Sequence, residues 1–140
     1  MIVDAKDLLV GRMAVHVAKA ALLGSEVHVI NCEKAVKSGS KAEVVNAYIH
    51  RVQRGVPAKG PYVHRKSHDI VKRVIRGMVP YRKEHGKKAF SRIKCYNGVP
   101  AAFAGKESEF VTFADANVSK LPMYKYVTIE RISQVLGAKQ

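Results

Sequence analysis

Hydrophobic and polar positions follow a helical period in several stretches of the chain. Residues 11–23 are apolar almost everywhere except at Arg12, His16 and Lys19. This spacing gathers the three polar side chains into one narrow stripe of a helix. A helix that is apolar on its other sides is mostly buried. We therefore predict a buried helix over 11–23 that ends at Gly24, a residue typical of helix C-termini.

The pattern predicts four further helices. The first begins at Ser40, since Ser40 and Glu43 have the S-x-x-E spacing of a capping box. The second begins at Ser67 and ends before Pro80, because proline lacks an N–H and disfavours α geometry in the preceding residue. The others cover 85–92 and 128–136. The predicted apolar sides are Val44, Val45, Tyr48, Ile49 and Val52 in the first helix, Ile70, Val71, Val74, Ile75 and Met78 in the second, and Ala89 and Phe90 in the third.

Short β-branched and apolar runs predict strands between these helices. The clearest are 2–4, 26–31 and 93–96, the last followed by an Asn97-Gly98 turn signal. Residues 110–113 fit either a strand or a packed loop. The order strand, helix, strand, helix is typical of an α/β fold with a parallel sheet.

The length and composition indicate one globular domain, 1–140. No run approaches the ~20 apolar residues that span a bilayer, and the first residues lack the pattern of a signal peptide. Cys32 and Cys95 form no CxxC pair, so we interpret both as small buried hydrophobes in a reduced protein. We expect a cytoplasmic protein without a membrane partner.

Charge changes this picture, because it is concentrated in one segment. The chain has 25 Lys and Arg against 11 Asp and Glu, a formal net charge of +14. Residues 51–106 hold fifteen of the cations and only two acids, for a net +13. Such concentration is typical of a protein with a phosphate-rich partner. The alternative is a solvated basic face that only aids solubility.

The basic residues fall in loops and on several predicted helices rather than on one recognition helix. This distribution favours contact with folded RNA over reading of the DNA major groove. Tyr62, His64, Tyr81 and Tyr96 are interleaved with the cations and offer stacking or hydrogen bonds. The predicted RNA-binding residues are Arg12, Lys19, Arg51, Arg54, Lys59, Arg65, Lys66, Lys72, Arg73, Arg76, Arg82, Lys83, Lys87, Lys88 and Arg92.

A catalytic alternative comes from acids that follow two predicted strands. Asp4 and Asp7 follow the first strand and Glu33 follows the second. Carboxyl ends of parallel strands are common ligand sites, and three carboxylates there could bind Mg²⁺ in a small nuclease. The structural alternative is that the two aspartates cap the first helix while Glu33 pairs with a lysine.

Other motifs carry less chemistry. His64 and His68 have a spacing that suits Zn²⁺ on a helix, but cations flank them and the predicted helix begins between them. Residues 98–106 do not have the spacing of a phosphate loop, and Gly11 is not part of a dinucleotide-binding motif. We therefore expect no metal, no cofactor, no small-molecule substrate and no enzymatic activity.

Four stretches resemble one known family, the universal ribosomal protein family L13 of the large subunit, in its archaeal and eukaryotic form. They are Val10–Ala14, Val29–Lys34 with Ser38-Gly39, Val74–Pro80 and Lys94–Pro100. The third is the most specific, with Lys87, Lys88 and Phe90 at the expected distance beyond it. The final forty residues match more loosely. Insertions and extensions typical of bacterial and eukaryotic members are missing, which indicates an archaeal type.

The resemblance implies a three-layer α/β/α domain with a parallel four-stranded sheet. It also implies a structural role in the ribosome, in which the protein binds and orders large-subunit rRNA early in assembly beside neighbouring ribosomal proteins. We expect no homo-oligomer. A free regulatory RNA binder is the remaining alternative.

Overall fold

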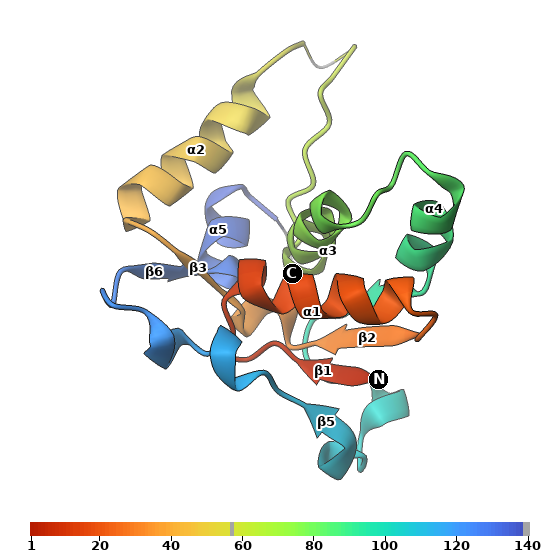
Figure 1. Ribbon diagram of the computed structural model, residues 1–140. Coiled ribbons are helices and arrows are strands. Elements are labelled where there is room, and N and C mark those ends of the chain that lie inside the picture. Colours follow the sequence, from red (N-terminus) through yellow and green to blue (C-terminus); the bar gives the residue numbers. More distant parts are fainter. Residues whose placement is uncertain (57, 139–140) are drawn as a thin grey trace.

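The computed structural model describes residues 1–56 and 58–138 (Figure 1). Its α-helices are α1 Val10–Leu22, α2 Lys41–Gln53, α3 Ser67–Met78, α4 Glu84–Ser91 and α5 Ile129–Val135. Its strands are β1 Ile2–Asp4, β2 Val27–Ile30, β3 Val36–Ser38, β4 Ile93–Cys95, β5 Phe110–Val111 and β6 Tyr126–Thr128. Five short 3₁₀ turns complete these elements: η1 Cys32–Lys34, η2 Ala101–Phe103, η3 Glu107–Glu109, η4 Ala114–Ala116 and η5 Val118–Lys120. Within this part of the chain no helix is long and apolar enough to cross a membrane.

The main sheet has four parallel strands in the order β4-β2-β1-β5. Helix α1 packs against this sheet, and α3 and α4 pack against α1, whereas α5 contacts α3, η1 and β6. The predicted three-layer α/β/α fold is therefore confirmed. The segment 110–113, which fitted either a strand or a packed loop, is a strand in its first half. Phe110 and Val111 form β5 and pair with β1 at the edge of the sheet.

Helix α1 is the central packing element. Met13, Ala14 and Val17 are fully buried, and the helix packs against α3 as well as the sheet. Its C-terminus is closed as predicted: Gly24, at a φ of +104°, donates to the carbonyl of Ala21, and Ser25 N–H donates to that of Ala20. This is the Schellman arrangement, which satisfies carbonyls that would otherwise lack partners.

A second sheet, of β3 and β6 in antiparallel pairing, was not predicted. Each strand has only three residues, and their pairing joins segments about ninety residues apart. Strands this short carry too little periodicity to be recognised, and the pairing itself depends on tertiary structure.

Two details of the predicted helices are wrong. Ser40 does stand at the N-cap of α2, but its side chain accepts no capping hydrogen bond, so no capping box forms. Met78, predicted to be buried at the end of α3, is 44% exposed. The end of α3 is instead anchored in the core by the next residue, Val79, which is buried.

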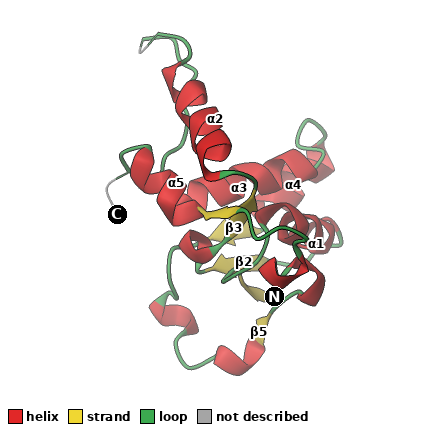
Figure 2. Cartoon of the chain, turned by 90° about the vertical axis from the view of Figure 1, so that its left-hand side faces the viewer, coloured by secondary structure: helices red, strands yellow, loops and turns green. Residues whose placement is uncertain are grey.

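Helix α2 and the connection over 54–66 stand away from the rest of the molecule (Figures 1 and 2). Only Val44 and Tyr48 of this helix are buried. The connection then returns to the body of the molecule at Ser67, the first residue of α3. This arrangement leaves a space between α2 and α3, and predicted RNA-binding residues line both of its walls.

Candidate nucleic-acid interface

All fifteen predicted RNA-binding side chains lie at the surface. Twelve are exposed, three (Lys72, Arg76 and Arg92) are half-buried, and none is buried. The core explains this result for α3, where Ile70, Val71 and Ile75 are buried. The cations of that helix therefore point away from α1, as the helical period predicts.

Four adjoining hollows bring eight of these residues together. A hollow of about 540 Å³ at the end of α2 shares Arg54 with one of about 480 Å³ between α2 and α3. The second shares Arg73 with a third of about 200 Å³ over α3, which shares Arg76 with a fourth of about 520 Å³ at the turn after α3. We call this surface the basic track, and its cations are Arg51, Arg54, Arg65, Lys72, Arg73, Arg76, Arg82 and Lys83.

The other seven predicted residues do not line these hollows. They are Arg12, Lys19, Lys59, Lys66, Lys87, Lys88 and Arg92. The side chains of three of them, Arg12, Lys88 and Arg92, already bond within the fold. Arg12 Nη1 donates to the carbonyl oxygen of Asp115 at 2.9 Å, and Arg92 Nη1 donates to that of Ala21 at 3.2 Å, near the C-terminus of α1.

The cations of the track are free of carboxylates. Among the fifteen predicted residues, only Lys88 forms an ion pair with an acid of the described chain, at 2.8 Å from Glu84. Asp69 is the one acid among the described residues that line these hollows, and it forms no ion pair with a cation of the track. Cations without an ion-pair partner keep most of their attraction for an external phosphate. The charge asymmetry of the sequence is therefore preserved on the folded surface.

Aromatic rings hold several of these cations in place. The Arg76 guanidinium lies 4.0 Å from the centroid of the Tyr81 ring, and Arg51 lies 5.3 Å from that of Tyr48. Lys72 lies 5.3 Å from the centroid of Phe90. Such cation–π contacts restrict long side chains and reduce the entropy lost when they bind a ligand.

The four residues proposed to stack or hydrogen-bond are not all in one place. Tyr62 and His64 line the track, and Tyr81 lines its last hollow. Tyr96 instead packs near His28 and Phe103, with ring centroids 6.1 Å from each. It therefore belongs to an aromatic cluster of the fold, outside the track.

Lys37 is a further cation that was not among the predicted RNA-binding residues. It lies on β3 beside Tyr48, which lines the track. Its ammonium lies 5.0 Å from the centroid of the Tyr48 ring, and burial, followed by the neighbouring charge of Arg51, lowers the pKa of Lys37. Burial also raises the pKa of the Tyr48 hydroxyl. Because β3 itself was not predicted, no signal in the sequence brought Lys37 beside α2.

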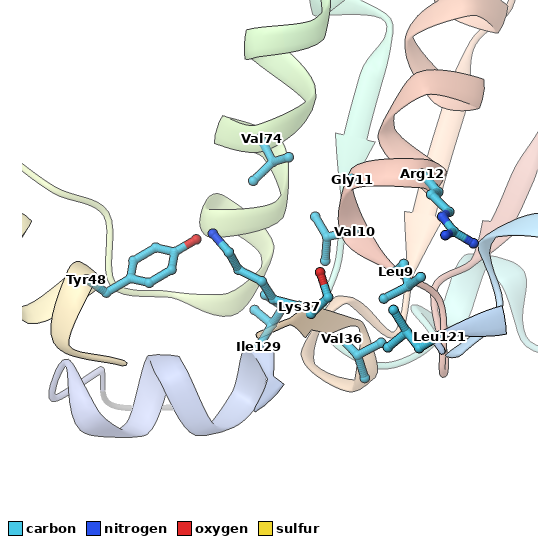
Figure 3. A pocket seen from close by; sticks show the side chains of 11 residues that line it. Leu9, Val10, Gly11, Arg12, Val36, Lys37, Tyr48, Val74, Leu121 and Ile129 are labelled. Carbon is cyan, nitrogen blue, oxygen red and sulfur yellow. The ribbon is translucent and has the colours of Figure 1, made fainter. Parts of the chain in front are cut away.

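Another cavity, of about 230 Å³, lies beside the track (Figure 3). Lys37 and the Tyr48 hydroxyl point toward each other at one end of it, and Val10, Val36 and Leu121 lie at the other. Its lining also includes Ser38 but no carboxylate, thiol or imidazole. A hydroxyl or amine in this cavity therefore has no carboxylate or imidazole in the lining to activate it.

Two of the three carboxylates considered for catalysis, those of Asp4 and Glu33, hold loops together instead, and Asp7 bonds through its backbone N–H and carbonyl. Asp4 Oδ1 accepts from Lys6 N–H at 3.0 Å and from Asn31 Nδ2 at 2.9 Å. Glu33 Oε2 accepts from Gly98 N–H at 2.9 Å. The structural alternative is wrong as well. Neither aspartate caps α1, which has no side-chain cap, and Glu33 bonds a backbone amide rather than a lysine.

No metal centre forms among the described residues, where no three His, Cys, Asp or Glu side chains gather. His64 and His68 each approach Asp69, at 3.9 and 3.8 Å. Cys32 is buried and Cys95 half-buried. A hydrogen bond with Cys95, followed by burial, raises the pKa of the Cys32 thiol, so at neutral pH it stays protonated and unreactive.

Comparison with known proteins identifies the family. Residues 1–102 match the family model described as ribosomal protein L13. The large ribosomal subunit proteins uL13 of Methanosarcina barkeri and Methanococcoides burtonii are 42% and 41% identical to this chain, and each alignment covers 99% of it and 98% of the relative. The protein of the same name from Halobacterium salinarum is 35% identical, over 99% of this chain and 91% of its own. This chain therefore belongs to the ribosomal protein L13 family, whose members are structural ribosomal proteins and not enzymes.

Proposed function

We propose that this protein is a structural constituent of the large ribosomal subunit and that it binds large-subunit rRNA through the basic track. Its relatives are named large ribosomal subunit proteins uL13, and this name supports the assignment to the large subunit. The observation that carries RNA binding is the set of four joined hollows, lined by eight cations of which none has a carboxylate partner in the described chain. Residues 51–106 supply the RNA-facing segment of a single domain.

The mechanism is electrostatic scaffolding. RNA segments repel one another, and cations held between them neutralise their phosphates and release counterions. Arginine suits this role, since its planar guanidinium can bond two phosphate oxygens at once. The α/β core fixes the spacing of these groups. We propose that the protein binds early in subunit assembly, in the cytoplasm, and later contacts neighbouring ribosomal proteins.

The dependence of binding on salt tests this proposal. Purified protein is titrated with transcribed large-subunit rRNA in a filter-binding assay, with excess tRNA as competitor, over a range of KCl concentrations. If six to ten phosphates are contacted, log affinity should fall against log salt with a slope of roughly −4 to −9. Binding to protein-free rRNA is expected, as an early role requires. An rRNA affinity no higher than that for tRNA would contradict the proposal.

A further inference from the structure

The hollow between α2 and α3 has a composition that differs from the rest of the track. It is lined by Tyr48, Arg51 and Arg54 of the α2 region, by Pro61, Tyr62, Val63 and His64, and by Ile70, Arg73, Val74 and Gly77 of α3. Arginines therefore occur on both walls, with apolar and aromatic side chains between them. Its volume of about 480 Å³ falls in the range of pockets that hold small ligands.

Tyr62 is the unusual residue of this hollow. Its side chain is 73% exposed, and among the described residues it has no aromatic or cation–π partner. An exposed tyrosine is usually mobile, but the hydroxyl of Tyr62 is held, since it donates to the carbonyl oxygen of Ala58 at 3.0 Å. The ring also lies over Gly60, where an added Cβ would be only 3.3 Å from it.

The loop that carries Tyr62 is closed tightly. Val56 and Gly60 form an antiparallel bridge, and a Cβ on Gly55 would lie 2.0 Å from the carbonyl oxygen of Gly60. Only glycine at position 55, where φ is +81°, allows this approach. The ring is thus presented on a tightly closed loop, within a hollow whose charged groups are Arg51, Arg54 and Arg73.

We propose that this hollow binds one unpaired RNA nucleotide, with its base stacked on Tyr62 and its phosphates beside Arg51, Arg54 and Arg73. This inference rests on the proposed function, and it adds that the RNA element selected by this hollow is an unpaired nucleotide. Paired bases are stacked within their helix and cannot reach the ring, whereas an extruded base offers a free face. An arginine on either wall contacts the two phosphates that flank such a base.

Two synthetic RNA hairpins test the proposal. They are identical except that one carries a single extruded 2-aminopurine and the other has this base within a paired stem. The protein should bind the extruded form more tightly and quench its fluorescence by stacking. Tyr62→Ala should bind the extruded hairpin about 10-fold more weakly and leave the fluorescence unquenched, while Tyr62→Phe should retain most of both effects.

Tyr124→Ala is the matched control, since Tyr124 is 80% exposed and lies outside the track. Melting curves confirm that each variant is folded. Equal binding of the two hairpins, with Tyr62→Ala and the parent protein indistinguishable, would overturn this inference while leaving the proposed function intact. Failure to bind either hairpin, together with failure to bind rRNA, would overturn the proposed function itself.

Discussion

Arg73 and Arg76 lie one turn apart on α3, and each lines two or more hollows of the track. Neither has a carboxylate partner in the described chain, and the side chains that bury α3 are on its other face. Their loss should therefore reduce RNA binding far more than stability. Arg76 also contacts Tyr81, so its own contribution includes the positioning of that ring.

The double variant Arg73→Ala/Arg76→Ala should lower affinity for rRNA and reduce the magnitude of the salt slope by about 1.5, as expected for two lost phosphate contacts. The measurement is filter binding at several salt concentrations. Lys6→Ala/Lys106→Ala is the matched control, because both lysines are exposed outside the track and the change in net charge is equal. Equal losses in the two double variants would show that net charge, and not the track, governs binding.

Ile75 lies on the same helix, but its substitution should reduce the stability of the fold. Its side chain is fully buried in the core, so Ile75→Ala should lower the free energy of unfolding by about 2–5 kcal/mol through the cavity it leaves. Urea denaturation followed by circular dichroism measures this change. Val135→Ala, at a position that is 39% exposed, should cost well under half as much. Similar losses at both positions would contradict the assigned core.

At the scale of elements, the tail after β5 is tied to α1 by Asp115 and Phe113. Asp115 of η4 accepts from His16 Nε2 at 2.8 Å, and its backbone carbonyl accepts from Arg12. The hydrogen bond from His16 is the main cause of a lowered pKa for the Asp115 carboxyl. His16 also stacks on Phe113, with ring centroids 4.4 Å apart. The tail therefore bonds to Arg12 and His16 of the polar stripe of α1 predicted from the sequence, and leaves Lys19 exposed.

A lowered pKa gives this contact a definite pH dependence. The carboxylate stabilises the fold above the ordinary Asp value of 3.8 and loses that contribution as the pH falls through its lower folded-state pKa. Asp115→Asn should therefore unfold at lower urea than the parent at pH 6. The difference should shrink as the pH falls below 3.8 and the Asp115 carboxylate becomes protonated. A difference that is unchanged between these pH values would show that the charge of Asp115 has no part in the contact.

The sequence was sufficient to predict the elements whose patterns are long or have clear end signals. Helix α3 has a well-separated apolar face and a proline just beyond its end, and α1 ends in a glycine motif that formed as expected. These signals are local, so they can be read without the fold. The charge count likewise identified the cationic segment, because surface cations stay at the surface in any fold.

The remaining features depend on contacts between distant segments. Strands β3 and β6 gain their structure by pairing with each other, and Lys37 reaches Tyr48 only because β3 lies where it does. Asp4 and Glu33 have the residue types of a metal site, but their partners, Asn31 and Gly98, are set by loop packing. The two hollows beside α2 depend on how α2 and the chain after it are placed relative to α3, which no local pattern encodes.

At the scale of the whole molecule, stability and the proposed RNA binding depend on different parts of the fold. The sheet with α1 and the apolar face of α3 supplies the core, whereas α2, the connection after it and the outer face of α3 supply the track. Changes to the track should therefore leave the fold intact, and changes to the core should remove both.

Sedimentation of a cell lysate tests the central claim most directly. A sucrose gradient is probed for this chain at moderate salt, and the large-subunit fractions are then washed at high salt and run again. The protein should migrate with large subunits and remain there after the wash, as a stoichiometric structural component would. Recovery only at the top of the gradient, or complete release by the wash, would contradict that role and favour a free regulatory RNA binder.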